Sequence, residues 1–138
     1  MLLRSTLTNR ESVYKTSKME ITSLNDRILK VELKGFQTIA EASRNGIMMK
    51  EAIYSRGIQL LLIDERELKA VSDEMKQFFK RSIDEIANSD IKKIAILSAD
   101  NIIARFGMEQ VITETENRIN YERRIFESEI EALGWLES

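Results

Sequence analysis

The sequence predicts an α/β domain with a mostly parallel sheet of four to five strands flanked by helices. Two observations support this fold class. Short apolar runs with the length of buried strands, at residues 60–63 and 94–97, lie between longer segments whose apolar residues recur every three or four positions. Strands that alternate with helices of this length are joined by right-handed crossovers, which pack the helices on the sheet. We expect the order β-β-α-β-α-β-α-β-α.

The first regular elements are two strands, at residues 19–24 and 27–33. They are separated by Asn25-Asp26, a pair that tolerates the left-handed backbone of a tight hairpin turn. Residues 28–33 alternate apolar and polar after Ile28, as a half-covered strand does.

Two amphipathic helices follow. The first ends before Gly57, and its apolar stripe repeats at intervals of three and four: Ile39, Ala42, Gly46, Met49 and Ile53. The second is separated from it by the strand at residues 60–64, and Ser72 can cap it, with Asp73 and Glu74 at its positive end. Its predicted buried stripe consists of Met75, Phe78, Phe79, Ile83 and Ile86.

The last third of the sequence contains two more helices and two strands. After the strand at 94–97, a helix is expected to start near Asp100 or Asn101 and to carry Ile102, Ile103 and Phe106. A final strand at 123–126 precedes a capping box made by Ser128 and Glu131. The closing helix is expected to turn three residues inward, with Trp135 beside them: Ile130, Leu133 and Leu136.

Residues 1–18 are polar and mildly basic and show no sustained period. We interpret them as a lead-in to a single domain at 19–138, because chain ends stay loose unless they are tied down. Docking as an additional edge strand is the alternative. The basic residues here are spread too widely to predict a nucleic-acid or membrane site.

Composition excludes several classes of site. The 138 residues include no Cys and no His, which rules out disulfides, thiolate metal sites, histidine bases and Ser-His-Asp triads. The glycines are isolated, so no phosphate-binding loop is present, and Tyr54, Lys50 and Ser55 match no catalytic motif. The net charge of −2 gives no general field for nucleic acid. We therefore expect a protein without catalytic activity or cofactor.

A charged residue, Arg4, already follows the first three residues, and the apolar segment of about 7–15 residues that a signal peptide needs is absent there. No run approaches the ~18 apolar residues that cross a bilayer. We expect a cytoplasmic protein without an integral membrane segment.

Two segments resemble a known family. An apolar strand ending in Asp64, followed by a turn and a helix that opens at Ser72-Asp73, resembles the STAS domain (sulfate transporter and anti-sigma factor antagonist). The ending Arg124-Ile125-Phe126-Glu127 with Ala132-Leu133-Gly134-Trp135-Leu136 is similar to the STAS-like group of small bacterial proteins. The resemblance runs from about residue 19 to the end.

The resemblance implies a non-enzymatic module that binds a protein partner or a small ligand. In anti-sigma factor antagonists a serine of the helix-capping loop is phosphorylated. Alignment of the strands puts Asp73 in the place of that serine, Ser72 in the place of the preceding Asp, and Met75 in the place of the following Gly. A fixed carboxylate resembles part of a phosphoserine's charge but cannot be switched.

Asp64 and Asp100 follow strands that are predicted to be parallel, at the sheet edge where ligands usually bind. Two carboxylates there could hold Mg²⁺ or accept a phosphoryl group. The structural interpretation, which we favour, is that Asp64 bonds the following turn and Asp100 caps a helix.

An alternative function is a carrier of a small apolar ligand or lipid, as in CRAL-TRIO proteins. The methionine and phenylalanine side chains that could line such a pocket are Met48, Met49, Met75, Phe78, Phe79, Phe106 and Met108. Such residues at helical spacing are usually core. The function we expect first is a regulatory or partner-binding module, with candidate binding residues Asp64, Ser72, Asp73 and Asp100 and with homodimerisation possible.

Overall fold

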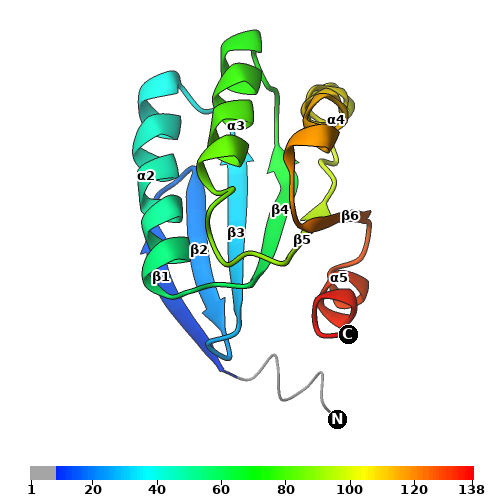
Figure 1. Cartoon of the computed structure of the whole chain (residues 1–138). Coiled ribbons are helices and arrows are strands. Elements are labelled where there is room, and N and C mark those ends of the chain that lie inside the picture. The colour runs from blue at the N-terminus through cyan, green and yellow to red at the C-terminus, as the bar shows by residue number, and fades with distance from the viewer. Residues whose placement is uncertain (1–8) are drawn as a thin grey trace.

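The computed structural model describes residues 9–138, and this part of the chain forms one sheet flanked by four α-helices (Figure 1). The strands are β1 (Arg10–Lys15), β2 (Met19–Leu24), β3 (Ile28–Gly35), β4 (Leu60–Leu68), β5 (Lys93–Leu97) and β6 (Glu122–Phe126). The helices are α2 (Ile39–Ser55), α3 (Asp73–Glu85), α4 (Ile102–Thr115) and α5 (Glu129–Leu136), and a short 3₁₀ turn, Glu116–Arg118, follows α4. The predicted α/β class is confirmed, and so is the predicted element order from β2 onward; β1 is an additional strand.

The sheet order is the order of the chain, β1 to β6. The pairs β1–β2 and β2–β3 are antiparallel, and the three following pairs are parallel. The sheet has six strands rather than the four or five predicted, because Arg10–Lys15 pair with β2 as an edge strand. This was the alternative to a loose lead-in, and it places the sheet's first strand before residue 19. Residues 1–8 of that predicted lead-in lie outside the described part.

The predicted hairpin between β2 and β3 is confirmed. Asn25 and Asp26 have φ values of 54° and 55°, the left-handed conformation that a two-residue turn requires at both positions. The turn fixes the register in which Leu24 lies opposite Ile28 and Met19 opposite Leu33.

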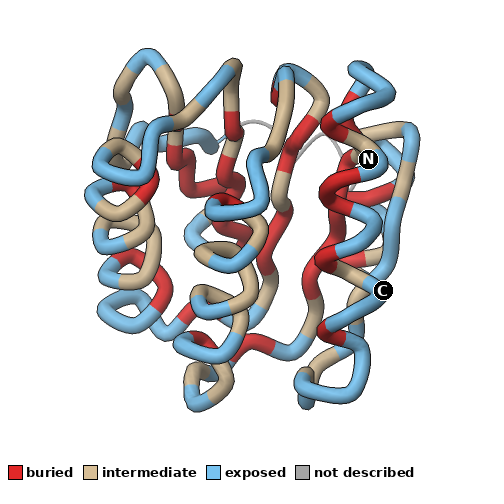
Figure 2. The backbone as a smooth tube through the Cα atoms, turned by 90° about the horizontal axis from the view of Figure 1, so that it is seen from above, coloured by how far each residue is buried: buried red, intermediate tan, exposed pale blue. Residues whose placement is uncertain are grey.

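The two faces of the sheet are covered unequally. Helices α2 and α3 stand in front of the sheet (Figure 1) and share one core with α4, whereas α5 packs on the opposite face. Viewed from above, buried residues gather in the strands and on the helix sides that face them (Figure 2). The opposite-face core combines α5 residues with alternate strand residues: Leu24, Ile28, Leu62, Ala95, Leu97, Ala132, Leu133 and Leu136.

Side-chain caps start the helices. Thr38 and Glu41 form a reciprocal capping box on α2, and Ser72 accepts a hydrogen bond from the Met75 amide, as predicted. The cap of α4 is Asn101, whose Oδ1 accepts from the Ile103 and Ala104 amides. At α5, Ser128 accepts from the Glu131 amide, which is one half of the predicted box.

One predicted feature of the later helices is wrong, and one was left open by the sequence. Ile130 of α5 does not turn inward, since it is 63% exposed; Leu133 and Leu136 do. In α4 the buried side is formed by Ala104, Gly107, Met108, Val111 and Thr115, so the three apolar residues that suggested the helix face outward. Within residues 9–138, no helix is both long and apolar enough to span a bilayer.

Candidate functional site

Asp64 lies inside β4 and not in a turn after it. The strand continues to Leu68 because β3 extends to Gly35 and pairs with it. The Asp64 carboxylate accepts hydrogen bonds from Arg66: two from the guanidinium, at 2.9 and 2.8 Å, and one from the backbone amide, at 3.1 Å. Burial acts to raise the pKa of Asp64, but these bonds and the Arg66 charge hold it below its usual value.

The pair extends into a charged network on the α5 face. Glu129, the first residue of α5, accepts from Arg66 at 3.1 Å and from Lys30 at 3.0 Å. Lys30 is buried, so this network neutralises two cations with two carboxylates between the sheet and α5. It ties the start of α5 to β3 and β4, and it leaves Asp64 engaged rather than open to a ligand.

Asp100 is exposed and precedes the actual cap, Asn101. Its backbone amide donates to the Arg66 carbonyl at 3.2 Å, which fixes the β5–α4 loop beside β4. The structure thus gives Asp64 and Asp100 different surroundings, one in the charged network and one in solvent. No group of three or more acidic residues in the described range could hold a metal ion.

Ser72 and Asp73 lie at the start of α3. Asp73 is almost fully exposed, with 97% of its side chain accessible, and its carboxylate is 3.4 Å from Lys76 Nζ. An anion in the first helical turn is favourable for α3. Its exposure leaves the charge available to a partner.

Three exposed apolar side chains project from the first turns of α4: Ile102 (65%), Ile103 (67%) and Phe106 (66%). We call them the α4 patch. The start of α3 lies beside this end of α4, because a Cβ built on Gly107 would be 3.2 Å from Val71 Cβ and Lys76 donates to Gln110 at 2.9 Å. The α4 patch and Asp73 therefore occupy the same end of the molecule, at the carboxyl ends of the parallel strands.

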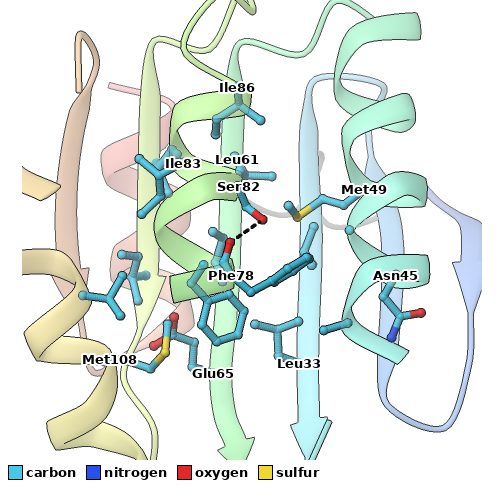
Figure 3. A pocket seen from close by; sticks show the side chains of 18 of the residues that line it. Leu33, Asn45, Met49, Leu61, Glu65, Phe78, Ser82, Ile83, Ile86 and Met108 are labelled. Carbon is cyan, nitrogen blue, oxygen red and sulfur yellow. Dashed lines mark hydrogen bonds between the residues drawn. The ribbon is translucent and has the colours of Figure 1, made fainter. Parts of the chain in front are cut away.

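A cavity of about 90 Å³ lies between the sheet and α2, α3 and α4. Four of the seven residues proposed for an apolar pocket line it, namely Met49, Phe78, Phe79 and Met108. Phe106 belongs instead to the exposed α4 patch. Figure 3 shows Glu65 and Met108 at one end of this cavity and Ile86 at the other.

The sequence analysis missed Glu65, which is 4% exposed and lines the cavity. Burial raises the pKa of the Glu65 carboxyl to about 8, and the nearby Asp64 charge acts in the same direction, against Arg123. The alternation Leu61, Ile63, Glu65 was the available signal, but it is visible only when the strand is extended beyond Asp64.

Searches of known proteins connect the chain to a fold and not to a described activity. No family model and no curated protein matches the sequence. A solved structure that the chain resembles is an uncharacterised protein of the DUF3478 family, with a SpoIIAA-like fold, from Shewanella loihica PV-4. Its TM-score is 0.60 at 16% sequence identity, over 93% of this chain and 94% of that one. The SpoIIAA-like fold is the STAS-like fold, so the fold suggested by the sequence resemblance is confirmed.

Proposed function

We propose that this protein is a non-enzymatic binding module whose protein partner docks on the α4 patch and on Asp73 beside it. The observation that carries the proposal is the exposure of Ile102, Ile103 and Phe106 on consecutive turns of one helix. Contiguous apolar surface bordered by charge is a common feature of protein interaction sites. The expected partner surface is apolar, with a cation placed to meet Asp73.

The chemistry of the sequence supports binding rather than catalysis. The chain has no His and no Cys, and the Asp64 carboxylate is engaged by Arg66. Asp73 occupies the position where the resemblance to anti-sigma factor antagonists places a phosphorylated serine. A permanent carboxylate there implies a partner that binds constitutively, without the phosphorylation switch.

The test is a comparison of proteins recovered with the purified chain from its native cells. Ile103→Asp and Asp73→Lys should each deplete the same partner, because one places a charge in the apolar contact and the other reverses the adjacent charge. Ile47→Asp is the matched control, since Ile47 is 63% exposed on α2. Equal recovery with all three variants and the wild type would refute the docking surface.

The homodimer is one outcome of the same experiment. If the recovered partner is a second copy of the chain, light scattering should show a dimer for the wild type and a monomer for Ile103→Asp. A dimer that persists in Ile103→Asp would place self-association elsewhere.

The cavity gives limited support to the carrier hypothesis. Its volume of about 90 Å³ is below the ~300 Å³ at which ordinary ligand pockets begin, and an acyl chain would need the helices to separate. Native mass spectrometry of the purified protein tests this alternative, which predicts a co-purified lipid.

A further inference from the structure

Glu65 presents an unpaired carboxyl to the cavity. Its side chain is buried, and it makes no hydrogen bond with any residue of 9–138. A buried polar group without a partner costs about 1–3 kcal/mol, so folded proteins usually supply one, from the protein, water or a ligand. Because the pKa of Glu65 is raised to about 8, the carboxyl is mostly neutral at pH 7 and can donate its proton in a hydrogen bond.

Arg123 of β6 also lines the cavity. Its guanidinium donates to Thr115 Oγ1 at 3.1 Å and to the Ile112 carbonyl at 2.8 Å, both neutral acceptors. It forms no ion pair with a carboxylate of the described residues. The cavity therefore combines a cation that forms no ion pair within residues 9–138 with a neutral carboxyl, and Tyr121, whose hydroxyl interacts with Arg123, lines it as well.

Apart from three further polar residues, Gln37, Asn45 and Ser82, the rest of the lining is apolar, and much of it is adaptable. Met49, Phe78 and Met108 line the same space, and thioether side chains adjust to a small guest. A cavity of about 150 Å³ accepts benzene, so by proportion the 90 Å³ here accommodates about four non-hydrogen atoms. The lining thus suits a molecule with one anionic head and a very short alkyl tail.

From these contacts we propose that the cavity binds a short aliphatic monocarboxylate, whose oxygens accept hydrogen bonds from Arg123 and the Glu65 carboxyl and whose tail contacts Met49 and Phe78. This inference does not depend on the α4 patch, which lies on the outside of the molecule.

The charged groups around Glu65 are few. Asp64 is its neighbour on the strand, Arg123 approaches from β6, and Arg105 and Glu109 of α4 line a small void of about 10 Å³ that Glu65 also reaches. Arg105 donates to the Ala99 carbonyl at 2.9 Å. Helices α2 and α3 contribute no charged residue to the main cavity lining. Arg123 and Glu65 therefore dominate the expected pH dependence.

The test is a titration of the whole protein at pH 6.5 with acetate, propionate, 1-propanol and propylamine. Binding is measured from the amide chemical shifts in ¹⁵N–¹H spectra. The carboxylates should give saturable shifts at residues around the cavity, and propylamine should not. Above pH 8 the affinity for propionate should fall about tenfold per pH unit, because Glu65 ionises and repels the ligand. Propanol binding as tightly as propionate, or no saturable shift with either carboxylate, would overturn the proposal.

Variants separate the two donors. Glu65→Gln keeps a donor and should bind propionate without loss above pH 8, whereas Glu65→Leu and Arg123→Met should each weaken binding about 10- to 100-fold. Arg124→Met is the control, because Arg124 lies over Trp135 on the α5 face, with 5.8 Å between its guanidinium carbon and the ring centroid. Should Arg123→Met fail to fold, the pH profile of Glu65→Gln still decides: a fall in affinity equal to that of the wild type contradicts the proposal.

Discussion

Two adjacent acidic residues of β4 show how position decides chemistry. Asp64 and Glu65 point to opposite faces of the sheet, as neighbours on a strand must. Asp64 meets Arg66 and its pKa is lowered; Glu65 enters the apolar cavity and its pKa rises to about 8. Asp64 is a charged member of the network under α5, whereas Glu65 is mostly protonated at pH 7 and can donate a hydrogen bond.

At the residue scale, we predict that Glu65→Gln changes the pH dependence of stability. The wild-type carboxyl has a pKa of about 8 in the folded state, against the ordinary glutamate pKa of 4.5 that it has in the unfolded chain. Between these values the folded state binds more protons, so the free energy of unfolding falls as pH rises through this window and levels off above it. Glu65→Gln removes this decline and should be more stable than the wild type at pH 9 by about 1–3 kcal/mol.

Urea unfolding at pH 5, 7 and 9 measures this effect. Glu67→Gln is the control, because Glu67 is exposed on the same strand and should leave the wild-type slope unchanged. An equal pH dependence in Glu65→Gln and the wild type would show that Glu65 has an ordinary pKa.

At the scale of the element, the composition of α4 explains why the sequence did not indicate which side of this helix is buried. The helix has apolar residues on both sides: Ile102, Ile103 and Phe106 outward, and Ala104, Met108 and Val111 inward. A helix of this composition gives no amphipathic signal for its buried side. The missing side chain of Gly107 lets α4 approach the start of α3, because a Cβ there would lie 3.2 Å from Val71 Cβ.

The start of α3 gives the second prediction. Ser72→Ala removes the acceptor that the Met75 amide uses at 3.2 Å, and it should lower the free energy of unfolding by about 1 kcal/mol. Ser72→Asp restores an acceptor and should keep stability close to that of the wild type. Thermal unfolding of the three proteins at pH 7 measures the difference. If Ser72→Ala and Ser72→Asp lower the stability equally, the side-chain acceptor is not what stabilises the start of α3.

On the scale of the whole molecule, the two faces of the sheet are covered unequally, and this determines how many residues stabilise each layer. Three helices share one core, while within residues 9–138 α5 is the helix that covers β4, β5 and β6 on the other face. The charged network of Asp64, Arg66, Glu129 and Lys30 borders this contact. The stability of the second layer therefore depends on few residues.

We accordingly predict that Leu133→Ala destabilises the protein by about 2–5 kcal/mol, since Leu133 is 1% exposed in the α5 core. Ile130→Ala is the matched control on the same helix: Ile130 is 63% exposed and should change stability by less than about 0.5 kcal/mol. Chemical denaturation of both variants provides the comparison. Similar losses would mean that α5 does not pack as described.

The sequence alone determined the α/β class, the β2–β3 hairpin and the capping of α3. These features depend on local chemistry: the period of apolar residues, the left-handed tolerance of Asn25-Asp26, and the oxygen of Ser72. Such signals need no knowledge of distant segments.

Only the tertiary structure decided which side of α4 is buried, that Arg10–Lys15 complete the sheet, and what Asp64 and Glu65 contact. Glu129 accepts a hydrogen bond from Arg66, the partner of Asp64, across 63 residues of chain, and Arg123 approaches Glu65 from another strand. Those contacts arise from strand register and helix packing, which bring together residues that no local pattern relates. The candidate sites are therefore products of the assembled sheet and its helices, although the fold itself is already indicated by local patterns in the chain.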